Sequence, residues 1–404
     1  MENRIKIIRA TTVPGSLNTF CRGLLKELTK QYEVVALSSP GETMQELAIR
    51  EGVRTIEIQM ERHISLLKDY RSLIALVRVF RQERPVMVHS MTPKAGLLCM
   101  IAAWLTRVPV RVHTFTGLVF PTSRGLKRWV LMLTDRLTCA CATHVIPEGM
   151  GVKSDLYNHH ITRKPLRVLG HGNVKGVDME YFSLRDDVKR KMEELKLRDD
   201  SVVTFLFVGR IVRDKGINEL YKAFTQLHQQ YSQTRLWLVG SFEDSLDPIS
   251  DDARKGIETN DAIFAVGRKS GDELLAYYAA ADCFVFPSYR EGFPNTVLEA
   301  GAMELASIVT DINGSREIVK EGINGLIVPS KDSDALYHAM EQMVIDEDYR
   351  KMLASNARRM IGSRFEQGFV RKCLYDFYDE ILNTLKLKRV GEQLDELQNV
   401  NTEL

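Results

Sequence analysis

Short apolar runs alternate along this chain with longer stretches in which apolar residues recur at helical spacing. The short runs predict buried β-strands, and the stretches between them predict amphipathic helices. Regular alternation of this kind is typical of an α/β fold whose parallel sheets are covered by helices on both faces. The expected strands of the first half are residues 5–8, 34–37, 55–58, 86–89, 110–113, 144–146 and 166–169, and those of the second half are residues 204–208, 236–239, 263–266, 283–286, 308–310 and 326–328.

The alternation runs through the chain twice, which predicts two domains. The chain has 404 residues, of which 44% are hydrophobic and 27% are charged, and this is enough for two domains with their own cores. Residues 170–178 are polar and rich in glycine, so we place the junction there or just after it. The predicted organisation is a first domain over residues 1–180, a second over residues 181–364, an amphipathic helix over residues 365–388 and a loose, polar tail over residues 389–404.

Two glutamates, Glu291 and Glu299, flank a glycine-bearing turn in the second half. An apolar run precedes the turn and a helical pattern follows it, which predicts Glu291 in a loop and Glu299 in a helix. The two residues would lie at most about 15 to 18 Å apart, which suits a ligand with a polyhydroxylated group at each end. Between them, the amides of Gly292, Phe293 and Asn295 lie near a helix N-terminus, where anionic groups are favoured. The alternative is that both glutamates are ordinary solvated charges.

Two cations, Arg210 and Lys215, flank the turn that follows the strand predicted at residues 204–208. A nucleoside diphosphate gathers negative charge as its bond to a sugar breaks. Arg and Lys fixed beside that leaving group stabilise the charge without a metal, and removing one such donor typically raises the barrier by about 3 to 4 kcal/mol. The alternative is that both residues are ordinary loop charges.

Taken together, these segments resemble the C-terminal half of the retaining glycosyltransferases of family 4, which have the GT-B fold. The resemblance consists of an Arg with a Lys five positions later, and then a Glu with a second Glu eight positions later, in this order. It extends into the first half, to residues 14–16 after the first strand and to His113 after the fifth. Residues 89–96 are similar to a segment of family members that build polyprenyl-linked bacterial glycans.

The resemblance implies a role for each matching residue. Arg210 and Lys215 would bind the diphosphate of the donor, and Glu299 would bind its ribose. The catalytic residues would be Glu291, which holds the donor sugar, and His113, which lies against the face of the reacting sugar. The other expected donor-binding residues are Gly15, Gly292, Phe293 and Asn295, and the candidates for the acceptor or the cleft are Ser16, His89 and Lys94.

The fold implied by the resemblance is a pair of Rossmann-like, doubly wound parallel-sheet domains that face an interdomain cleft. In this fold the C-terminal helix often crosses back onto the first domain. The sequence departs from the family pattern at two positions. Gly15 stands alone where many relatives have two adjacent glycines, and Lys175 stands where relatives often have Asn.

The implied function is the transfer, with retention at the anomeric carbon, of a hexose or N-acetylhexosamine from a nucleotide-diphosphate sugar, most simply UDP-linked. The acceptor would be a polyprenyl-diphosphate-linked glycan of a bacterial capsule, O-antigen or similar surface polymer. No metal or other cofactor is expected. Two alternatives stay open: a nucleotide-sugar 2-epimerase of the same fold, and an inactive nucleotide-binding scaffold for polysaccharide assembly.

The net charge of +2 conceals an asymmetry between the two halves. Residues 1–180 contain 26 Lys and Arg against 15 Asp and Glu, whereas the remainder contains 29 against 38. Basic residues interleaved with apolar ones at residues 62–84 and 118–129 favour peripheral contact with an anionic membrane. The alternative is that these are covering helices with basic outer faces. No apolar run of about 18 residues and no signal-like N-terminus is present, so we expect a cytoplasmic protein at the inner face of the membrane. Nucleic acid is not an expected partner.

Overall fold

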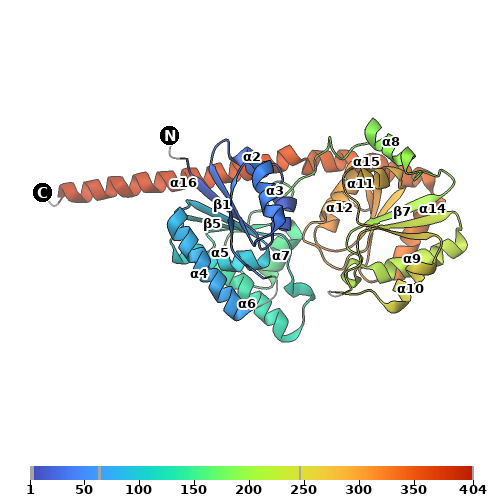
Figure 1. Ribbon diagram of the computed structural model, residues 1–404, viewed down its shortest axis with the longest axis horizontal. Helices are drawn as coiled ribbons and strands as arrows, with labels where there is room; N and C mark the ends of the chain where they lie inside the picture. Colours follow the sequence, from blue (N-terminus) through green and yellow to red (C-terminus); the bar gives the residue numbers. More distant parts are fainter. Residues whose placement is uncertain (1–3, 62–64, 245–246, 403–404) are drawn as a thin grey trace. The chain divides into compact units, whose positions relative to one another are not determined.

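The computed structural model describes residues 4–61, 65–244 and 247–402, which fall into two compact units. The first unit comprises the described parts of Met1–Glu148, Val152–Lys175 and Gly368–Leu404, and the second comprises those of Gly149–Gly151 and Gly176–Gln367. Each unit is a sheet covered by helices (Figure 1). The division between Lys175 and Gly176 falls inside the polar, glycine-rich stretch of the sequence.

The first unit is built on a six-stranded sheet in the order β3-β2-β1-β4-β5-β6, in which every neighbouring pair is parallel. The order reverses between β1 and β4, and ligands of such sheets bind beyond the carboxyl ends of the strands beside this reversal. The strands are β1 (Lys6–Ala10), β2 (Glu33–Ser38), β3 (Arg54–Glu57), β4 (Met87–Met91), β5 (Val110–Phe115) and β6 (His144–Pro147).

Helices cover both faces of this sheet because its strands are apolar on both faces. Successive residues of a strand point to opposite faces, so Ile7 joins one core and Ile8 the other. One face is covered by α1 (Pro14–Cys21), α2 (Leu24–Leu28), α3 (Glu42–Glu51) and α16 (Gln367–Thr402). The other is covered by α4 (Leu66–Glu83), α5 (Pro93–Leu105), α6 (Gly125–Cys141) and α7 (Met150–Asn158), with the 3-10 turn η1 (Phe120–Thr122) before α6.

The C-terminal helix α16 is part of the core of the first unit. Its residues Leu374, Phe377, Tyr378 and Ile381 are buried among the strands and helices of that face. Burying a large apolar side chain completely contributes about 1.5 to 3 kcal/mol to the free energy of unfolding. This part of the chain therefore stabilises a sheet whose strands lie far away in the sequence.

The prediction of a loose tail after residue 388 is wrong, because α16 continues to Thr402. The tail contains no proline and is rich in Glu, Gln and Leu, which are good helix formers, so polarity alone does not end the helix.

The second unit repeats the architecture, with strand order β12-β11-β10-β7-β8-β9 and a reversal between β10 and β7. Its strands are β7 (Val203–Val208), β8 (Thr234–Val239), β9 (Ile263–Gly267), β10 (Cys283–Phe286), β11 (Ala306–Thr310) and β12 (Gly325–Val328). Its helices are η2 (Arg213–Lys215), α8 (Asp186–Glu194), α9 (Ile217–Gln230), α10 (Asp251–Thr259), α11 (Gly271–Ala280), α12 (Asn295–Ala302), α13 (Ser315–Ile318), α14 (Ser333–Ile345) and α15 (Glu347–Phe365).

The predicted fold class, two doubly wound parallel sheets, is confirmed. All predicted strands are present except the one at residues 166–169, where the prediction was wrong. Leu166 makes a single parallel bridge with Val145, and no ladder follows. Pro165 has no amide to donate, and Gly170 turns the chain with a φ of +55°, so the segment cannot extend as an edge strand.

The turn that follows β7 depends on one glycine. Gly216 has a φ of +73°, and a Cβ at this position would lie 2.1 Å from the carbonyl oxygen of Pro287, in the loop after β10. Two loops from neighbouring strands therefore approach each other at Gly216 more closely than any side chain allows.

We predict that Gly216→Ala lowers the free energy of unfolding by about 3 kcal/mol or more, since a left-handed alanine costs about 1 to 2 kcal/mol and the collision adds to it. Gly52→Ala is the matched control, because Gly52 has a φ of +64° but no atom within 4 Å of the added Cβ. The free energy of unfolding of Gly52→Ala should fall only by the backbone cost of about 1 to 2 kcal/mol. Urea unfolding measures this free energy for both variants, and an equal decrease in both would contradict the close approach of Gly216 to Pro287.

Candidate active site

The two predicted phosphate-binding cations lie at the carboxyl end of β7 and are each paired with a carboxylate. Arg210 Nη1 lies 2.8 Å from Glu243 Oε2. Lys215, the last residue of η2, forms an ion pair with Glu291, and its Nζ lies 5.2 Å from the centre of the Phe286 ring. Neither cation is therefore an isolated surface charge.

Glu291 is held in place by its surroundings. Its side chain is 17% exposed and that of Lys215 is 15% exposed, so this ion pair is partly buried. The fully buried hydroxyl of Ser288 lies 2.9 Å from Oε1 of Glu291. A partly buried carboxylate with a cation and a hydroxyl as partners has a fixed position, which is what a sugar-binding residue requires.

Glu299 lies inside α12 and is only 8% exposed, so the alternative that it is a solvated helix charge is wrong. The buried phenol of Tyr278 donates a hydrogen bond of 3.3 Å to Glu299 Oε2. Burial, and the neighbouring charge of Glu299, raise the pKa of Tyr278 well above its usual value, so the phenol remains a donor.

Two residues between the glutamates have different roles: Phe293 is buried in the core, and Asn295 begins α12. Phe293 is 5% exposed and packs edge-on against Phe365, with ring centres 5.3 Å apart, so its side chain anchors the loop in the core. Asn295 is the first residue of α12, and the preceding Pro294 provides no side-chain cap for the helix. The carbonyl oxygen of Gly292 would lie 2.5 Å from a Cβ at Gly314, so a second loop packs tightly against this turn.

These second-unit residues gather at one edge of the sheet because β7 and β10 are direct neighbours, with Phe205 opposite Cys283. The sequence pattern predicted Arg210, Lys215, Glu291 and Glu299 as site residues. It did not predict their partners, which are Glu243, Ser288 and Tyr278. Ser288 comes two residues after β10, in the position from which parallel sheets present ligand-binding groups, and this was the one available signal.

In the first unit, His113 lies near the end of β5 and is 1% exposed. Its Nδ1 lies 2.9 Å from the hydroxyl of Ser90, and its ring meets Phe115 edge-on. A Cβ on Gly96 would lie 2.3 Å from Cε1 of the ring, so α5 must carry a glycine there. Burial lowers the pKa of His113 to about 3, against a smaller opposing effect of a hydrogen bond with the backbone of Ser90. His113 is therefore neutral near pH 7.

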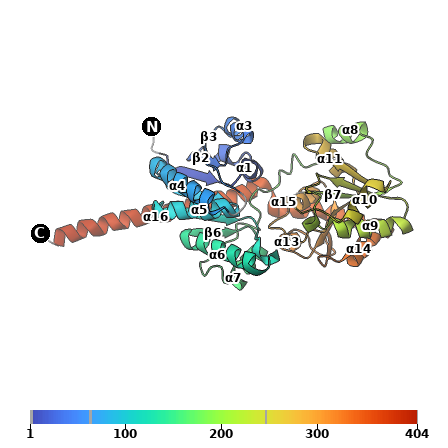
Figure 2. The same ribbon diagram turned by 60° about the horizontal axis from the view of Figure 1, so that its bottom comes forward.

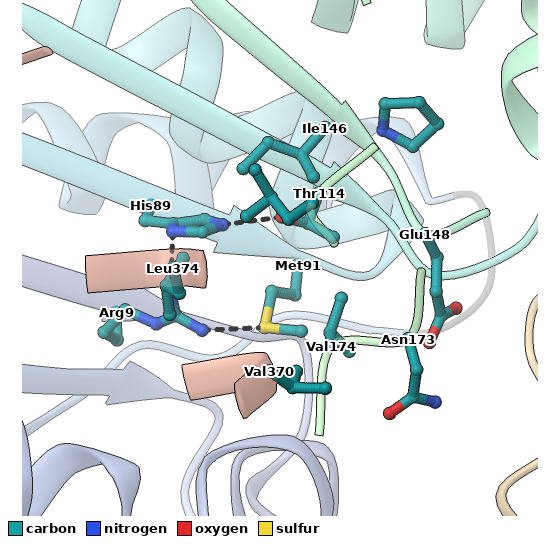
Figure 3. Close-up of a pocket in the computed structure, with 12 residues that line it drawn as sticks. Arg9, His89, Met91, Thr114, Ile146, Glu148, Asn173, Val174, Val370 and Leu374 are labelled. Atoms are coloured by element: carbon teal, nitrogen blue, oxygen red, sulfur yellow. Dashed lines mark hydrogen bonds between the residues drawn. The ribbon is translucent and has the colours of Figure 1, made fainter. Parts of the chain in front are cut away.

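His89, offered by the sequence as an acceptor candidate, lies in a buried network instead (Figure 3). Its Nδ1 lies 2.6 Å from Arg9 Nη1 and 2.6 Å from the hydroxyl of Tyr378, and its Nε2 lies 2.7 Å from the hydroxyl of Thr114. Because a guanidinium can only donate, Nδ1 accepts and Nε2 carries the proton. Burial, and then the charge of Arg9, hold the pKa of His89 well below its usual value. We therefore assign His89 to the packing of α16 and not to acceptor binding.

The cavity beside this network is too small to be a substrate site. It has a volume of about 20 Å³ and is lined by Arg9, His89 and Met91 together with residues of β6 and α16. A volume of this size holds a water molecule, whereas ligand sites in proteins have volumes of about 300 to 1,000 Å³.

The remaining first-unit candidates differ in accessibility. Lys94 forms an ion pair with Asp69, and its side chain is only 9% exposed. Gly15 and Ser16 lie in the first turn of α1, not in a loop, and Gly15 is exposed with no atom within 4 Å of an added Cβ. Gly15 and Ser16 are thus the more accessible candidates, although no close backbone approach requires the glycine. In the part of the chain that the structure describes, no group of three or more His, Cys, Asp or Glu residues could hold a metal ion.

Comparisons with known proteins identify the family. The family model described as "Glycosyl transferases group 1" matches residues 188–360, and the one described as "Glycosyl transferase 4-like domain" matches residues 15–172. The chain is 32% identical over 390 residues to the capsular polysaccharide biosynthesis glycosyltransferase CapM of Staphylococcus aureus, covering 95% of this chain and 98% of CapM.

A second relative is the UDP-Gal:alpha-D-GlcNAc-diphosphoundecaprenol alpha-1,3-galactosyltransferase of Escherichia coli, which is 28% identical over 311 residues, covering 75% of this chain and 78% of that protein. Among solved structures, HepE of Anabaena in complex with UDP superposes with a TM-score of 0.76 at 16% identity, covering 93% of this chain and all of that one, which shows the shared fold. The glycosyltransferase predicted from the sequence is confirmed, and the chain belongs to the group 1 glycosyltransferases, the retaining GT-B enzymes of family 4.

Proposed function

We propose that this enzyme transfers a hexose or N-acetylhexosamine from a UDP-linked sugar to a polyprenyl-diphosphate-linked glycan, in the assembly of a capsule, O-antigen or similar surface polysaccharide. The similarity to CapM over nearly the full length of both chains supports the pathway. The name of the Escherichia coli relative, which specifies a UDP-sugar and a diphosphoundecaprenol acceptor, supports the two substrates. The observation that carries the proposal is the contact of Lys215 with Glu291 at the sheet edge from which Arg210 also projects.

In this proposal Arg210 and Lys215 bind the diphosphate of the donor. As the bond to the sugar breaks, negative charge develops on the phosphates, and fixed cations stabilise it more in the transition state than in the bound donor. Glu299 binds the ribose and Glu291 the sugar hydroxyls. Because these two cations supply the positive charge, the proposal includes no resident metal.

The proposal assigns no carboxylate nucleophile. In a retaining glycosidase two carboxyl groups about 5 Å apart act as nucleophile and acid. Here Glu291 is paired with Lys215 and Ser288, an arrangement suited to holding hydroxyls. The acceptor attacks from the face that the diphosphate leaves, and the departing phosphate takes the acceptor proton. His113 is neutral at physiological pH, so it orients and polarises the reacting sugar.

The lipid-linked acceptor requires an enzyme that works beside a membrane, and we assign this contact to the helices α4 to α6 of the first unit, where α5 packs between the other two (Figure 2). Leu126, Trp129, Leu133 and Leu137 recur at helical spacing on α6 and are 44% to 77% exposed. Exposed basic residues, Arg124 and Lys127 among them, flank this apolar row. Apolar side chains flanked by basic ones favour insertion into an anionic interface.

The membrane contact expected for residues 118–129 changes at Phe120. Phe120, in the apolar stretch before α6, is fully buried against the ring of His159, so it does not enter the membrane. No helix within the described residues is long and apolar enough to cross a membrane. We therefore propose peripheral attachment to the inner face of the cell membrane, through α6 and the start of α4, where Leu66 and Leu67 are 81% and 79% exposed.

We predict an acceptor-dependent gain in mass when the protein is incubated with UDP-, GDP- and ADP-sugars and polyprenyl-diphosphate-linked glycans, followed by mass spectrometry with and without EDTA. Glu291→Gln should slow turnover by about 100-fold. UDP binding should stay largely intact, because the lost carboxylate contacts the sugar hydroxyls and not the phosphates. Glu258→Gln is the matched control, because Glu258 is 56% exposed and pairs with Arg254 on α10.

Four results would contradict parts of this proposal. A product released as a free, isomerised sugar nucleotide would favour the epimerase, and nucleotide binding without any product would favour the scaffold. Full activity of Glu291→Gln would remove Glu291 from the site. Loss of activity in EDTA would contradict the metal-free donor site.

We predict that the protein loses stability on acidification because His113 is buried in the neutral form. Its pKa is about 3 in the folded chain, against 6.5 for an unperturbed histidine. Between these values the unfolded chain binds more protons, so the stabilisation present above pH 6.5 is lost as the pH falls towards 3. His113→Asn should therefore reduce the pH dependence of the unfolding free energy by up to about 1.4 kcal/mol per pH unit. Ile345→Asn, at a side chain that does not titrate and is 63% exposed, should leave the pH dependence unchanged, and an identical slope in both variants would contradict the neutral, buried state.

We predict that replacing Trp129 and Leu133 together with Ser weakens binding to vesicles containing phosphatidylglycerol by about ten-fold or more, because two partly inserted apolar side chains are lost. Ile345→Ser, at a side chain on α14 that is 63% exposed, is the control. Vesicle co-sedimentation measures all three proteins, and unchanged binding of the double variant would exclude α6 as the contact.

A further inference from the structure

We propose that Glu243 weakens nucleotide-diphosphate binding by competing for Arg210, and so promotes release of the nucleotide after transfer. This inference rests on the proposed function, because it takes Arg210 as a phosphate ligand. Its basis is the ion pair of 2.8 Å between Arg210 Nη1 and Glu243 Oε2, formed at the edge of the sheet where the donor diphosphate is expected.

Glu243 follows β8, in a segment that is firmly joined to the turn after β7, residues 210–215, which we call the cationic turn. The amide of Ile211 donates a hydrogen bond of 2.9 Å to the carbonyl of Ser241, and Ile211 forms a parallel bridge with Phe242. A Cβ on Gly240 would lie 1.8 Å from the carbonyl oxygen of Gly209, so the ends of β7 and β8 touch through backbone alone. Residues 240–242 therefore hold the start of this loop in place, and Glu243, the next residue, reaches Arg210 from there.

A second acid of the same loop, Asp247, has a different role. Its Oδ2 accepts a hydrogen bond of 2.7 Å from the amide of Asp214, and its Oδ1 lies 2.9 Å from Arg213 Nη2. Asp247 thus holds the backbone of the turn. The contact of Glu243 is instead with the functional side chain of Arg210, and backbone support does not explain it.

The two ion pairs of the site differ in strength. The pair of Lys215 and Glu291 is partly buried and is reinforced by Ser288. In the pair of Arg210 and Glu243 the side chains are 48% and 30% exposed, so solvent screens their attraction. A diphosphate, with more charge and more acceptor oxygens than a carboxylate, can therefore displace Glu243 from Arg210.

The competition lowers the affinity for donor and product by the same factor, and this matters most for the product. When the sugar leaves, the nucleoside diphosphate gains a negative charge, so the cations that stabilise the transition state also bind the product more tightly. Product release limits turnover in many enzymes. A carboxylate that returns to Arg210 lowers the affinity for the product, and a neutral residue at the same position would not.

The test compares UDP binding by isothermal titration calorimetry in the full-length protein. Glu243→Gln should bind UDP about two- to five-fold more tightly than the unmodified protein, the range expected for a solvent-exposed pair. Arg210→Ala should bind about ten-fold or more weakly, because a charged hydrogen bond to phosphate is lost. The double variant with Glu243→Gln and Arg210→Ala should bind UDP no more tightly than Arg210→Ala alone. The increase in UDP affinity of Glu243→Gln should become smaller in about 1 M NaCl.

Two further variants serve as controls. Asp244→Asn removes the same charge from the next residue, which lies 3.5 Å from Arg254, and should leave UDP affinity unchanged. Glu243→Asp keeps the charge and should bind more weakly than Glu243→Gln. Circular dichroism establishes that each variant is folded.

The outcomes separate this inference from the proposed function. If Arg210→Ala weakens binding but Glu243→Gln weakens it too or leaves it unchanged, the inference is wrong and the phosphate role of Arg210 stands. An equal gain in Asp244→Asn would also overturn it, because the effect would then be general charge. If Arg210→Ala binds UDP normally, Arg210 is not a phosphate ligand, and the proposed donor site fails together with the inference.

Discussion

The pairing of β7 with β10 decides where the chemistry of the second unit can take place. The two strands run parallel, with Phe205 opposite Cys283, so their carboxyl ends lie next to each other. The turn after β7 carries Lys215 and the loop after β10 carries Glu291, 76 positions later in the sequence, and the two side chains meet as an ion pair. A sheet with a different strand order would contain the same two motifs without bringing them together.

The same neighbourhood limits which residues can surround the site. The left-handed turn at Gly216 brings the backbone of the cationic turn against Pro287, directly before Ser288. The hydroxyl of Ser288 also lies 3.2 Å from the carbonyl oxygen of Asp214, so one buried group connects the cationic turn, the loop after β10 and Glu291. The positions of the proposed site residues are therefore set by backbone packing before any ligand binds. Ligand binding then carries little free-energy cost for ordering these side chains.

Much of this arrangement could be predicted from the sequence, because hydrophobic periodicity and residue spacing are local properties. The strands, the loop position of Glu291 and the helical position of Glu299 follow from short segments. The environment of each side chain could not be predicted in the same way. His89 resembled a ligand residue, but it is buried by Tyr378, which lies 289 positions away. For Glu299, predicted to bind the ribose, the alternative of a solvated charge is excluded only by its burial and by the contact with Tyr278, on another helix. Burial depends on which distant elements pack together, and a local pattern does not contain that information.

The residues assigned to the reaction are electrostatically similar in the two units, and this constrains the proposed mechanism. In the first unit the residue with a catalytic assignment, His113, is neutral and buried, so it has little capacity to accept a proton near pH 7. In the second unit Arg210 and Lys215 are cations that pair with Glu243 and Glu291, so this group of side chains offers no strong base either. A strong base supplied by the protein is thus missing from the residues assigned to the reaction, and the most basic group created during transfer is the departing phosphate itself. In the proposed mechanism, proton transfer to that phosphate couples deprotonation of the acceptor to bond cleavage on the same face of the sugar, which leads to retention of configuration.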